Sequence, residues 1–150
     1  MADDAVLDTI ETQVAMLMRL GEATRRATEL KPHRALDRSA YVILRLLQAA
    51  GPLNVSALAD RLNLDGSTVT RQVTALEKDG LVQRRPDPRD GRGTVIEPTG
   101  TGLTQVEAVR RARRQVYDVV LSDWSEPDRA QLAAVLERLA GTLDGYLRRS

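Results

Sequence analysis

Apolar residues recur at helical spacing in both terminal parts of the chain. Near the start, intervals of 3, 4 and 3 residues separate Leu7, Ile10, Val14 and Leu17. Charged residues fill the positions between them, so the pattern predicts a long amphipathic helix over about residues 3–27. In the last part, the same periodicity appears in Leu132, Val135, Leu136, Leu139, Leu143, Tyr146 and Leu147. It predicts a final helix whose start signal is the segment 125–128, where a serine precedes an acidic residue and a proline.

Capping and turn residues divide the middle of the chain into shorter elements. Lys31-Pro32-His33 ends the first helix. Three short helices are predicted over residues 39–50, 55–62 and 66–79, with N-caps at Asp37, Asn54 and Asp65. Gly51-Pro52 and Gly80 are the stop signals of the first and the third of them.

A hairpin and a further helix are predicted to follow. Two short runs of β-favouring residues, 81–84 and 94–97, enclose a segment dense in turn formers. Pro98 ends the second run, and Thr99 is placed to cap a helix over residues 99–121. No internal repeat is present, and no linker is long enough to divide the chain. The predicted order is therefore helix, helix, helix-turn-helix, hairpin, helix, helix.

The helices at 55–62 and 66–79 are joined by Asn63-Leu64-Asp65, which is the spacing of a helix-turn-helix. At about 100° per residue, one face of the second helix carries Val69, Val73 and Leu76. The opposite face carries Ser67, Arg71, Thr74 and Lys78. Short hydroxyls and cations suit contacts with phosphates and base edges. The alternative interpretation is an ordinary solvated helix face.

Two features of this helix favour DNA as its partner. Arg71 is the candidate for reading a guanine, because a guanidinium can bond to O6 and N7 together. The backbone amides of Ser67 and Thr68 lie at the start of the helix, where a phosphate binds favourably.

The predicted hairpin tip is rich in arginine. Its cations are Arg84, Arg85, Arg89 and Arg92, and Asp87 and Asp90 oppose them. We interpret Asp90 as orienting a neighbouring arginine while Arg89 or Arg92 enters the minor groove. The alternative is a charged turn in which the opposite charges neutralise one another, and exposed pairs of that kind contribute only about 0–1 kcal/mol.

Composition excludes most other kinds of chemistry. Lys and Arg number 22 against 21 Asp and Glu, so the net charge of +1 decides nothing and the distribution of charge matters. The chain has no Cys and one His, His33, which excludes thiol chemistry and Cys-ligated metals and leaves no base for a nucleophilic serine. We therefore expect no enzyme, no cofactor and no metal site. Phe is absent and aromatic residues are few, which favours duplex over single-stranded nucleic acid.

Localisation is predicted from the start of the chain and from its hydropathy. The first residues are acidic and lack the basic start and apolar core of a signal peptide. Nowhere do about 18 apolar residues run together, as a membrane-spanning helix requires. We expect a soluble, cytoplasmic protein with no membrane partner.

The sequence resembles the MarR family of winged-helix transcriptional regulators in four segments. They are NVSALADRL at residues 54–62, STVTR at 67–71, LEKDGLV at 76–82 and RRPDPRDGR at 84–92. The last contains the family's Asp-Pro-x-Asp-x-Arg wing element. Two positions depart from the family pattern, with Gly91 where many members have a second arginine and Pro98 where an apolar strand residue is usual.

The resemblance implies a mainly α fold with a small β-hairpin wing, a winged helix-turn-helix flanked by N- and C-terminal dimerisation helices. Residues 1–150 then form a single domain, with the DNA-binding lobe at about 37–98 and dimerisation helices at about 3–30 and 99–149. The implied function is a homodimeric repressor on a pseudo-palindromic operator, with the recognition helix in the major groove and the wing in the minor groove. The expected DNA contacts are Ser67, Thr68, Thr70, Arg71, Thr74, Lys78, Arg84, Arg89 and Arg92.

In this family, small ligands commonly relieve repression, so the resemblance implies a small-molecule effector, whose binding residues the sequence leaves unknown. Side chains on segments that could approach an effector are Met16, Met18, His33, Tyr41 and Arg45. Each is better explained otherwise: Met16, Met18 and Tyr41 by packing, Arg45 by an ion pair and His33 by a loop position. The run 110–114 places four arginines around a helix and is interpreted as solvated or interface-bridging. The alternative function is a dimeric winged-helix adaptor that binds protein and has weak DNA affinity.

Overall fold

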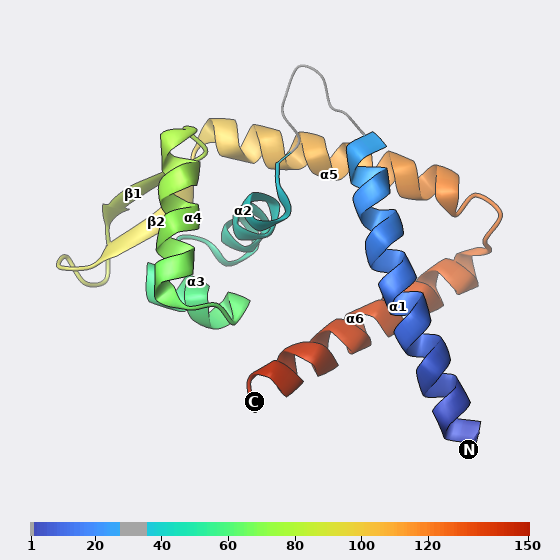
Figure 1. Ribbon diagram of the computed structural model, residues 1–150. Helices are drawn as coiled ribbons and strands as arrows, with labels where there is room; N and C mark the ends of the chain where they lie inside the picture. The colour runs from blue at the N-terminus through green and yellow to red at the C-terminus, as the bar shows by residue number, and fades with distance from the viewer. Residues whose placement is uncertain (1, 28–35) are drawn as a thin grey trace. The chain divides into compact units, whose positions relative to one another are not determined.

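The computed structural model of the protein describes residues 2–27 and 36–150. The chain divides into two compact units, residues 1–35 and residues 36–150, and each is described by itself. The first unit contains the helix α1 (Ala2–Ala27). The second contains α2 (Arg38–Ala50), α3 (Val55–Leu62), α4 (Gly66–Lys78), β1 (Val82–Pro86), β2 (Thr94–Pro98), α5 (Gly100–Val120) and α6 (Glu126–Leu147) (Figure 1). The predicted break at Lys31-Pro32-His33 and the predicted dimerisation residues 28–30 lie outside the described residues.

Side-chain caps begin five of the helices where the sequence predicts. In each case, the capping oxygen accepts a hydrogen bond from the backbone N–H three residues later, which satisfies a donor that the helix leaves unpaired. The caps are Asp37 to Ala40 at 2.7 Å, Asn54 to Ala57 at 2.7 Å, Asp65 to Thr68 at 2.8 Å, Thr99 to Gly102 at 3.0 Å and Ser125 to Asp128 at 3.2 Å. The predicted starts of α2 to α6 are thereby confirmed to within one residue.

The hydrophobic core lies in the part of the second unit that contains the helix-turn-helix. Its fully buried side chains are Ile43, Leu44, Leu47, Leu58, Val69, Val73, Val82, Ile96 and Val106. They come from α2, α3, α4, both strands and the first half of α5, and burying each contributes about 1.5–3 kcal/mol. This core holds α4 and the hairpin in one rigid lobe.

The two strands form an antiparallel hairpin that runs from Val82 opposite Pro98 to Pro86 opposite Thr94. The predicted strand 81–84 is therefore displaced and short, and the predicted strand 94–97 starts correctly but is short, because both strands continue to a proline. A proline lacks the N–H of a ladder bond, but at the last residue of a strand in a two-stranded sheet this loss is tolerated. Leu53 adds an isolated bridge to Ile96, with backbone bonds of 3.1 and 2.7 Å.

Both terminal helices carry exposed apolar side chains. None of the 22 residues of α6 is buried, and its exposed apolar side chains are Val135, Leu136, Leu139, Leu143, Tyr146 and Leu147. In α1, the exposed apolar side chains are Val6, Leu7, Ile10, Met16, Leu17, Met18 and Leu20. Within residues 2–27 and 36–150, every helix is too short or too polar to cross a bilayer.

Candidate nucleic-acid interface

The helix α4 has one buried face and one exposed face. Val69 and Val73 are completely buried, and Leu76 is 4% exposed. Thr70, Arg71, Thr74 and Lys78 are exposed, as is Ser67, while Thr68 is half-buried. The predicted division of this helix is confirmed, and its outward face presents hydroxyls and cations.

Asp65 organises the start of α4. Its carboxylate accepts hydrogen bonds from the Ser67 hydroxyl, from the Thr68 hydroxyl at 2.7 Å and from the Thr68 backbone N–H at 2.8 Å. These bonds, the one from Ser67 first, hold the pKa of Asp65 well below its usual range, so the carboxylate is ionised at neutral pH. The prediction that the Thr68 amide is free for a phosphate is wrong for this conformation, because Asp65 already accepts its hydrogen.

The same bonds engage the hydroxyl groups of Ser67 and Thr68, which limits the hydrogen bonds that these side chains can make to DNA. Both hydroxyl hydrogens point to Asp65, whereas a DNA phosphate can only accept hydrogen bonds. Either hydroxyl must therefore leave Asp65 before it donates to DNA. Arg71 lies beside them, with Nη2 3.5 Å from the Thr68 hydroxyl oxygen.

Arg84 joins the hairpin to α4. Its Nε lies 3.5 Å from a carboxylate oxygen of Glu77, and its Nη2 lies 3.5 Å from the hydroxyl oxygen of Thr74. Thr74 in turn donates its hydroxyl hydrogen to the carbonyl of Thr70 at 2.8 Å. Arg84 is thus placed between the wing and the recognition helix, with its charge partly balanced by Glu77.

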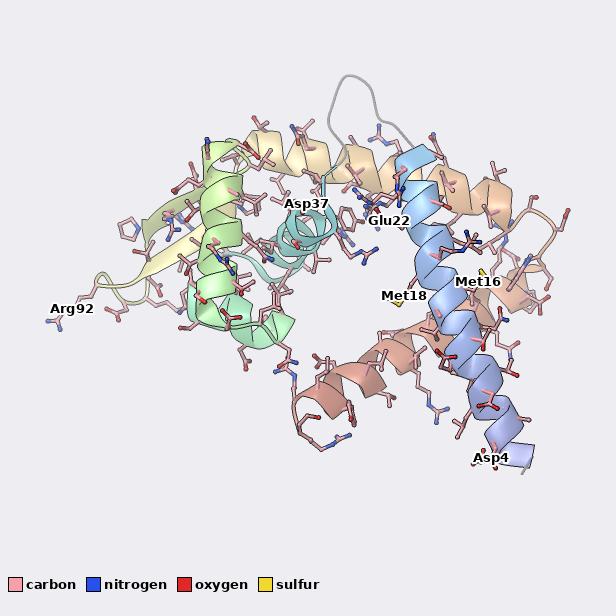
Figure 2. The ribbon with its side chains drawn as sticks, viewed as in Figure 1. Asp4, Met16, Met18, Glu22, Asp37 and Arg92 are labelled. Atoms are coloured by element: carbon pink, nitrogen blue, oxygen red, sulfur yellow. The ribbon has the colours of Figure 1, made fainter. Side chains whose placement is uncertain are left out.

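Aspartates shape the backbone of the hairpin tip. Asp87 accepts from the backbone N–H of Arg89 at 2.8 Å, and Asp90 accepts from that of Arg92 at 3.1 Å. Asp90 therefore acts on Arg92 through the main chain. In this fully described segment, neither aspartate forms an ion pair with a guanidinium. Both arginine side chains are exposed, and Arg92 points away from the protein at the far end of the hairpin (Figure 2).

Arg85, like Arg84, has a carboxylate partner. Its Nε lies 3.0 Å from a carboxylate oxygen of Glu97, which also accepts a bond from Gln83 at 2.8 Å. This cross-strand pair stiffens the hairpin. Four cations on α4 and the wing tip have no ion-pair partner among the described residues: Arg71, Lys78, Arg89 and Arg92.

Two of the residues considered for an effector, Tyr41 and Arg45, are engaged with other residues. The guanidinium of Arg113 lies 4.2 Å from the ring centre of Tyr41, and Arg45 donates to Gln48 at 2.7 Å. Met16 and Met18 are exposed on α1, and His33 lies outside the described residues. In the part of the chain that the structure describes, no three potential metal-binding side chains gather.

A cavity of about 570 Å³ lies where α5 turns into α6, and the sequence pattern does not predict it. Its lining includes Arg111, Arg114 and Arg129 together with Tyr117 and Asp118. Arg111 and Arg114 belong to the arginine run 110–114, for which the sequence predicts a solvated or interface-bridging position. No periodicity signals a cavity of this kind, because its residues come from two helices separated by a turn.

Comparison with known proteins gives matches along most of the chain. A model of the MarR family matches residues 36–94. The HTH-type transcriptional regulator YxaD of Bacillus subtilis is 36% identical over 104 residues, which are 69% of this chain and 73% of YxaD. The HTH-type transcriptional repressor IacR of Pseudomonas putida is 27% identical over 117 residues, 78% of this chain and 70% of IacR.

Solved structures match in fold. A MarR family protein from Bacillus stearothermophilus has a TM-score of 0.77 at 22% identity, covering 93% of this chain and 96% of that one. The PcaV transcriptional regulator from Streptomyces coelicolor, solved in complex with its natural ligand, has a TM-score of 0.64 at 23% identity, with coverages of 84% and 89%. These likenesses confirm the predicted fold, six helices with a two-stranded wing.

Proposed function

Because the chain belongs to the MarR family of transcriptional regulators, we propose that it is a homodimeric repressor that binds a pseudo-palindromic duplex operator. The fold and the relatives are those of DNA-binding regulators and not of enzymes. One observation carries the proposal. The outward face of α4 and the wing tip of the same lobe carry cations without carboxylate partners among the described residues, as a surface that meets phosphates requires.

The proposed contacts follow from this placement. The recognition helix α4 lies in the major groove and the wing in the minor groove, with Arg71 reading a base edge. The full set of proposed DNA contacts is Ser67, Thr68, Thr70, Arg71, Thr74, Lys78, Arg84, Arg89 and Arg92. Ser67 and Thr68 take part only after they leave Asp65, and Arg84 takes part from its position beside Glu77.

A second copy of this chain is the proposed cover for the terminal helices. The apolar side chains of α6 are exposed, with Leu136 at 48% and Leu143 at 53%. Those of α1 are exposed as well, and exposed apolar surface of this extent marks an interface. We assign residues of about 3–30 and 99–149 to dimerisation and about 37–98 to DNA binding, within a single domain of residues 1–150.

A small-molecule effector completes the proposal. The similar regulator PcaV was solved in complex with its natural ligand, and by analogy a ligand relieves repression by this protein. Such a ligand acts only through different affinities for two arrangements of the lobes. Release of a bound duplex on addition of a compound is the assay for it.

The experiment that tests the proposed function is a fluorescence anisotropy titration on duplexes. The purified protein is titrated against an inverted repeat selected from a random duplex pool and against a scrambled duplex, each at two salt concentrations. We expect tight binding to the repeat, with half-sites about one helical turn apart. Weak, salt-labile binding to both duplexes would instead support the protein-binding adaptor.

Arg71→Ala is expected to weaken binding to the selected repeat by about 1–3 kcal/mol and to relax base preference at one position of each half-site. The physical reason is the loss of a bidentate contact to a base edge. Lys78→Ala is the matched control, and we expect it to weaken all duplexes equally. An equal loss on every sequence for Arg71→Ala would make Arg71 a phosphate contact. Anisotropy on single-base variants of the repeat distinguishes the two roles.

The double variant Arg89→Ala with Arg92→Ala is expected to lower affinity and to flatten its dependence on salt. Each phosphate contact that is removed lowers the slope of log K against log salt by about 1. The control is Arg138→Ala with Arg149→Ala, which removes the same charge from exposed positions on and beyond α6. Identical slopes for the two double variants would place the wing outside the DNA interface.

A further inference from the structure

Arginine side chains at both ends of α6 form hydrogen bonds to other parts of the second unit. At the first end, the guanidinium of Arg129 donates to the carbonyl of Leu121 at 3.0 and 2.6 Å and lies 3.3 Å from a carboxylate oxygen of Asp118. These bonds fix the corner between α5 and α6. At the other end, Arg148 reaches the helix-turn-helix, to which the C-terminal end of α6 returns (Figure 1).

Arg148 joins residues that are far apart in the sequence. Its Nη2 donates to the backbone carbonyl of Asp60 at 2.7 Å, and its Nη1 lies 3.5 Å from the Asp60 carboxylate. Its Nε donates to the carboxylate of Asp144, one turn earlier in α6, at 2.8 Å. We call these bonds the Arg148 bridge. Asp144 in α6 holds Nε of the guanidinium, while Nη1 and Nη2 face Asp60 in α3. The bridge therefore connects α6 to α3.

The bridge meets α3 at its carbonyl end. The last carbonyls of a helix have no partner within it, and a cation is favourable there. Arg148 bonds to the Asp60 carbonyl, which also accepts the backbone N–H of Asn63 at 3.2 Å. Asn63 takes the left-handed conformation there, with φ of 51°, and turns the chain toward α4. Asp65, which caps α4, follows directly. The bridge therefore acts on the turn that orients the recognition helix.

We propose that Arg148 is a positioning residue for DNA recognition, which holds the helix-turn-helix at a set position relative to α6. The inference rests on the proposed function, in which α6 lies in the dimer interface and α4 in the major groove. No residue of α6 is buried within the described chain, so its position relative to α3 depends on the few contacts at its ends. In a dimer, the bridge transmits the geometry of the interface to both recognition helices.

The consequence is a defined distance between the two recognition helices. Half-sites on DNA lie at multiples of one helical turn, and a dimer discriminates between spacings only if its lobes are held firmly. Without the bridge, each DNA-binding lobe tilts more freely relative to α6, about the corner between α5 and α6. The expected signature is a loss of spacing preference, and a lost phosphate contact would not produce it.

The test compares Arg148→Ala with Arg149→Ala, which removes the same charge from the next residue. The probes are the inverted repeat selected by the wild-type protein and the same repeat with one or two base pairs inserted between its half-sites. We expect Arg148→Ala to bind the original repeat on the order of tenfold more weakly, with a smaller penalty for the inserted base pairs. Arg149→Ala is expected to match the wild type at every spacing.

Two conservative substitutions in the Arg148 bridge test the same inference in case Arg148→Ala does not fold. In Arg148→Lys, one ammonium replaces three separated nitrogens, so the spacing preference is expected to be intermediate. Asp144→Asn weakens the hold of α6 on Arg148 and is expected to shift the profile in the same direction as Arg148→Ala. Sedimentation and thermal unfolding are expected to show folded dimers for all four variants.

The outcomes separate this inference from the proposed function. If Arg148→Ala and Arg149→Ala give the same spacing profile as the wild type, the Arg148 bridge has no role in positioning and the proposed function stands. A loss of equal size at every spacing would also overturn the inference, because it would make Arg148 a general affinity determinant. If the wild-type protein selects no inverted repeat, the proposed function fails and the inference fails with it.

Discussion

Leu139→Asp is expected to convert the proposed dimer into a folded monomer that no longer binds the selected repeat tightly. Leu139 lies on the apolar side of α6 and is 36% exposed in one copy of the chain. In the proposed dimer, the aspartate would be buried without a partner, which costs about 3–5 kcal/mol. Sedimentation velocity measures the mass, and anisotropy on the selected repeat measures the loss of two-site binding.

The structure also says why this variant stays folded. The core that holds the winged helix together is formed by α2 to α5 and the hairpin, and α6 contributes no buried residue to it. Far-UV circular dichroism is therefore expected to change little. Ala134→Asp adds the same charge to the opposite side of α6 and is expected to remain a dimer. A dimeric Leu139→Asp protein would show that this stripe is not the interface.

Gly102→Ala is expected to destabilise the lobe by about 3 kcal/mol or more. A Cβ atom at Gly102 would lie 2.0 Å from the carbonyl oxygen of Leu81 and 2.9 Å from its carbonyl carbon. Both are backbone atoms, so no side-chain rotation relieves the overlap, and one backbone has to move. The first turn of α5 is held in this place by Thr99, whose backbone N–H donates to Leu81 at 3.0 Å and whose hydroxyl donates to Gly80 at 2.6 Å.

Gly100→Ala is the matched control for that substitution. It lies two residues earlier in the same helix, and no atom lies within 4 Å of a Cβ placed there. Its stability is expected to change by no more than about 0.5 kcal/mol or to rise slightly, because alanine restricts the unfolded chain. Urea unfolding followed by circular dichroism compares the two variants. Equal midpoints would mean that α5 does not pack against Leu81 as closely as the structure has it.

The sequence predicts the local structure of this protein well because short-range interactions decide it. The capping residues Asp37, Asn54 and Asp65 bond to amides three residues away, within the reach of a sequence pattern. The burial of Val69 and Val73 follows from helical periodicity in the same way. The exposed face of α4 is predicted for that reason, although the proposed contacts of its side chains with DNA stay a prediction.

The sequence does not predict the hydrogen-bond partners of the polar side chains. The sequence places Ser67 and Thr68 on the exposed helix start without revealing that both hydroxyls are held by Asp65. It also suggests that Asp90 orients a neighbouring arginine, without revealing that Asp90 accepts the backbone N–H of Arg92. In each case, several donors lie within reach of one carboxylate, and only the local backbone path selects among them.

By itself, the sequence determined the helices, the turn between α3 and α4, the hairpin and the buried face of α4. Tertiary structure alone decided that Arg84 meets Glu77, that Gly102 touches the backbone of Leu81 and that Arg148 bonds to Asp60, 88 residues away. Periodicity encodes which side of an element is apolar, and caps encode where it begins. Neither encodes the distance between two elements, because that distance is set by how the side chains of several elements pack together in the core.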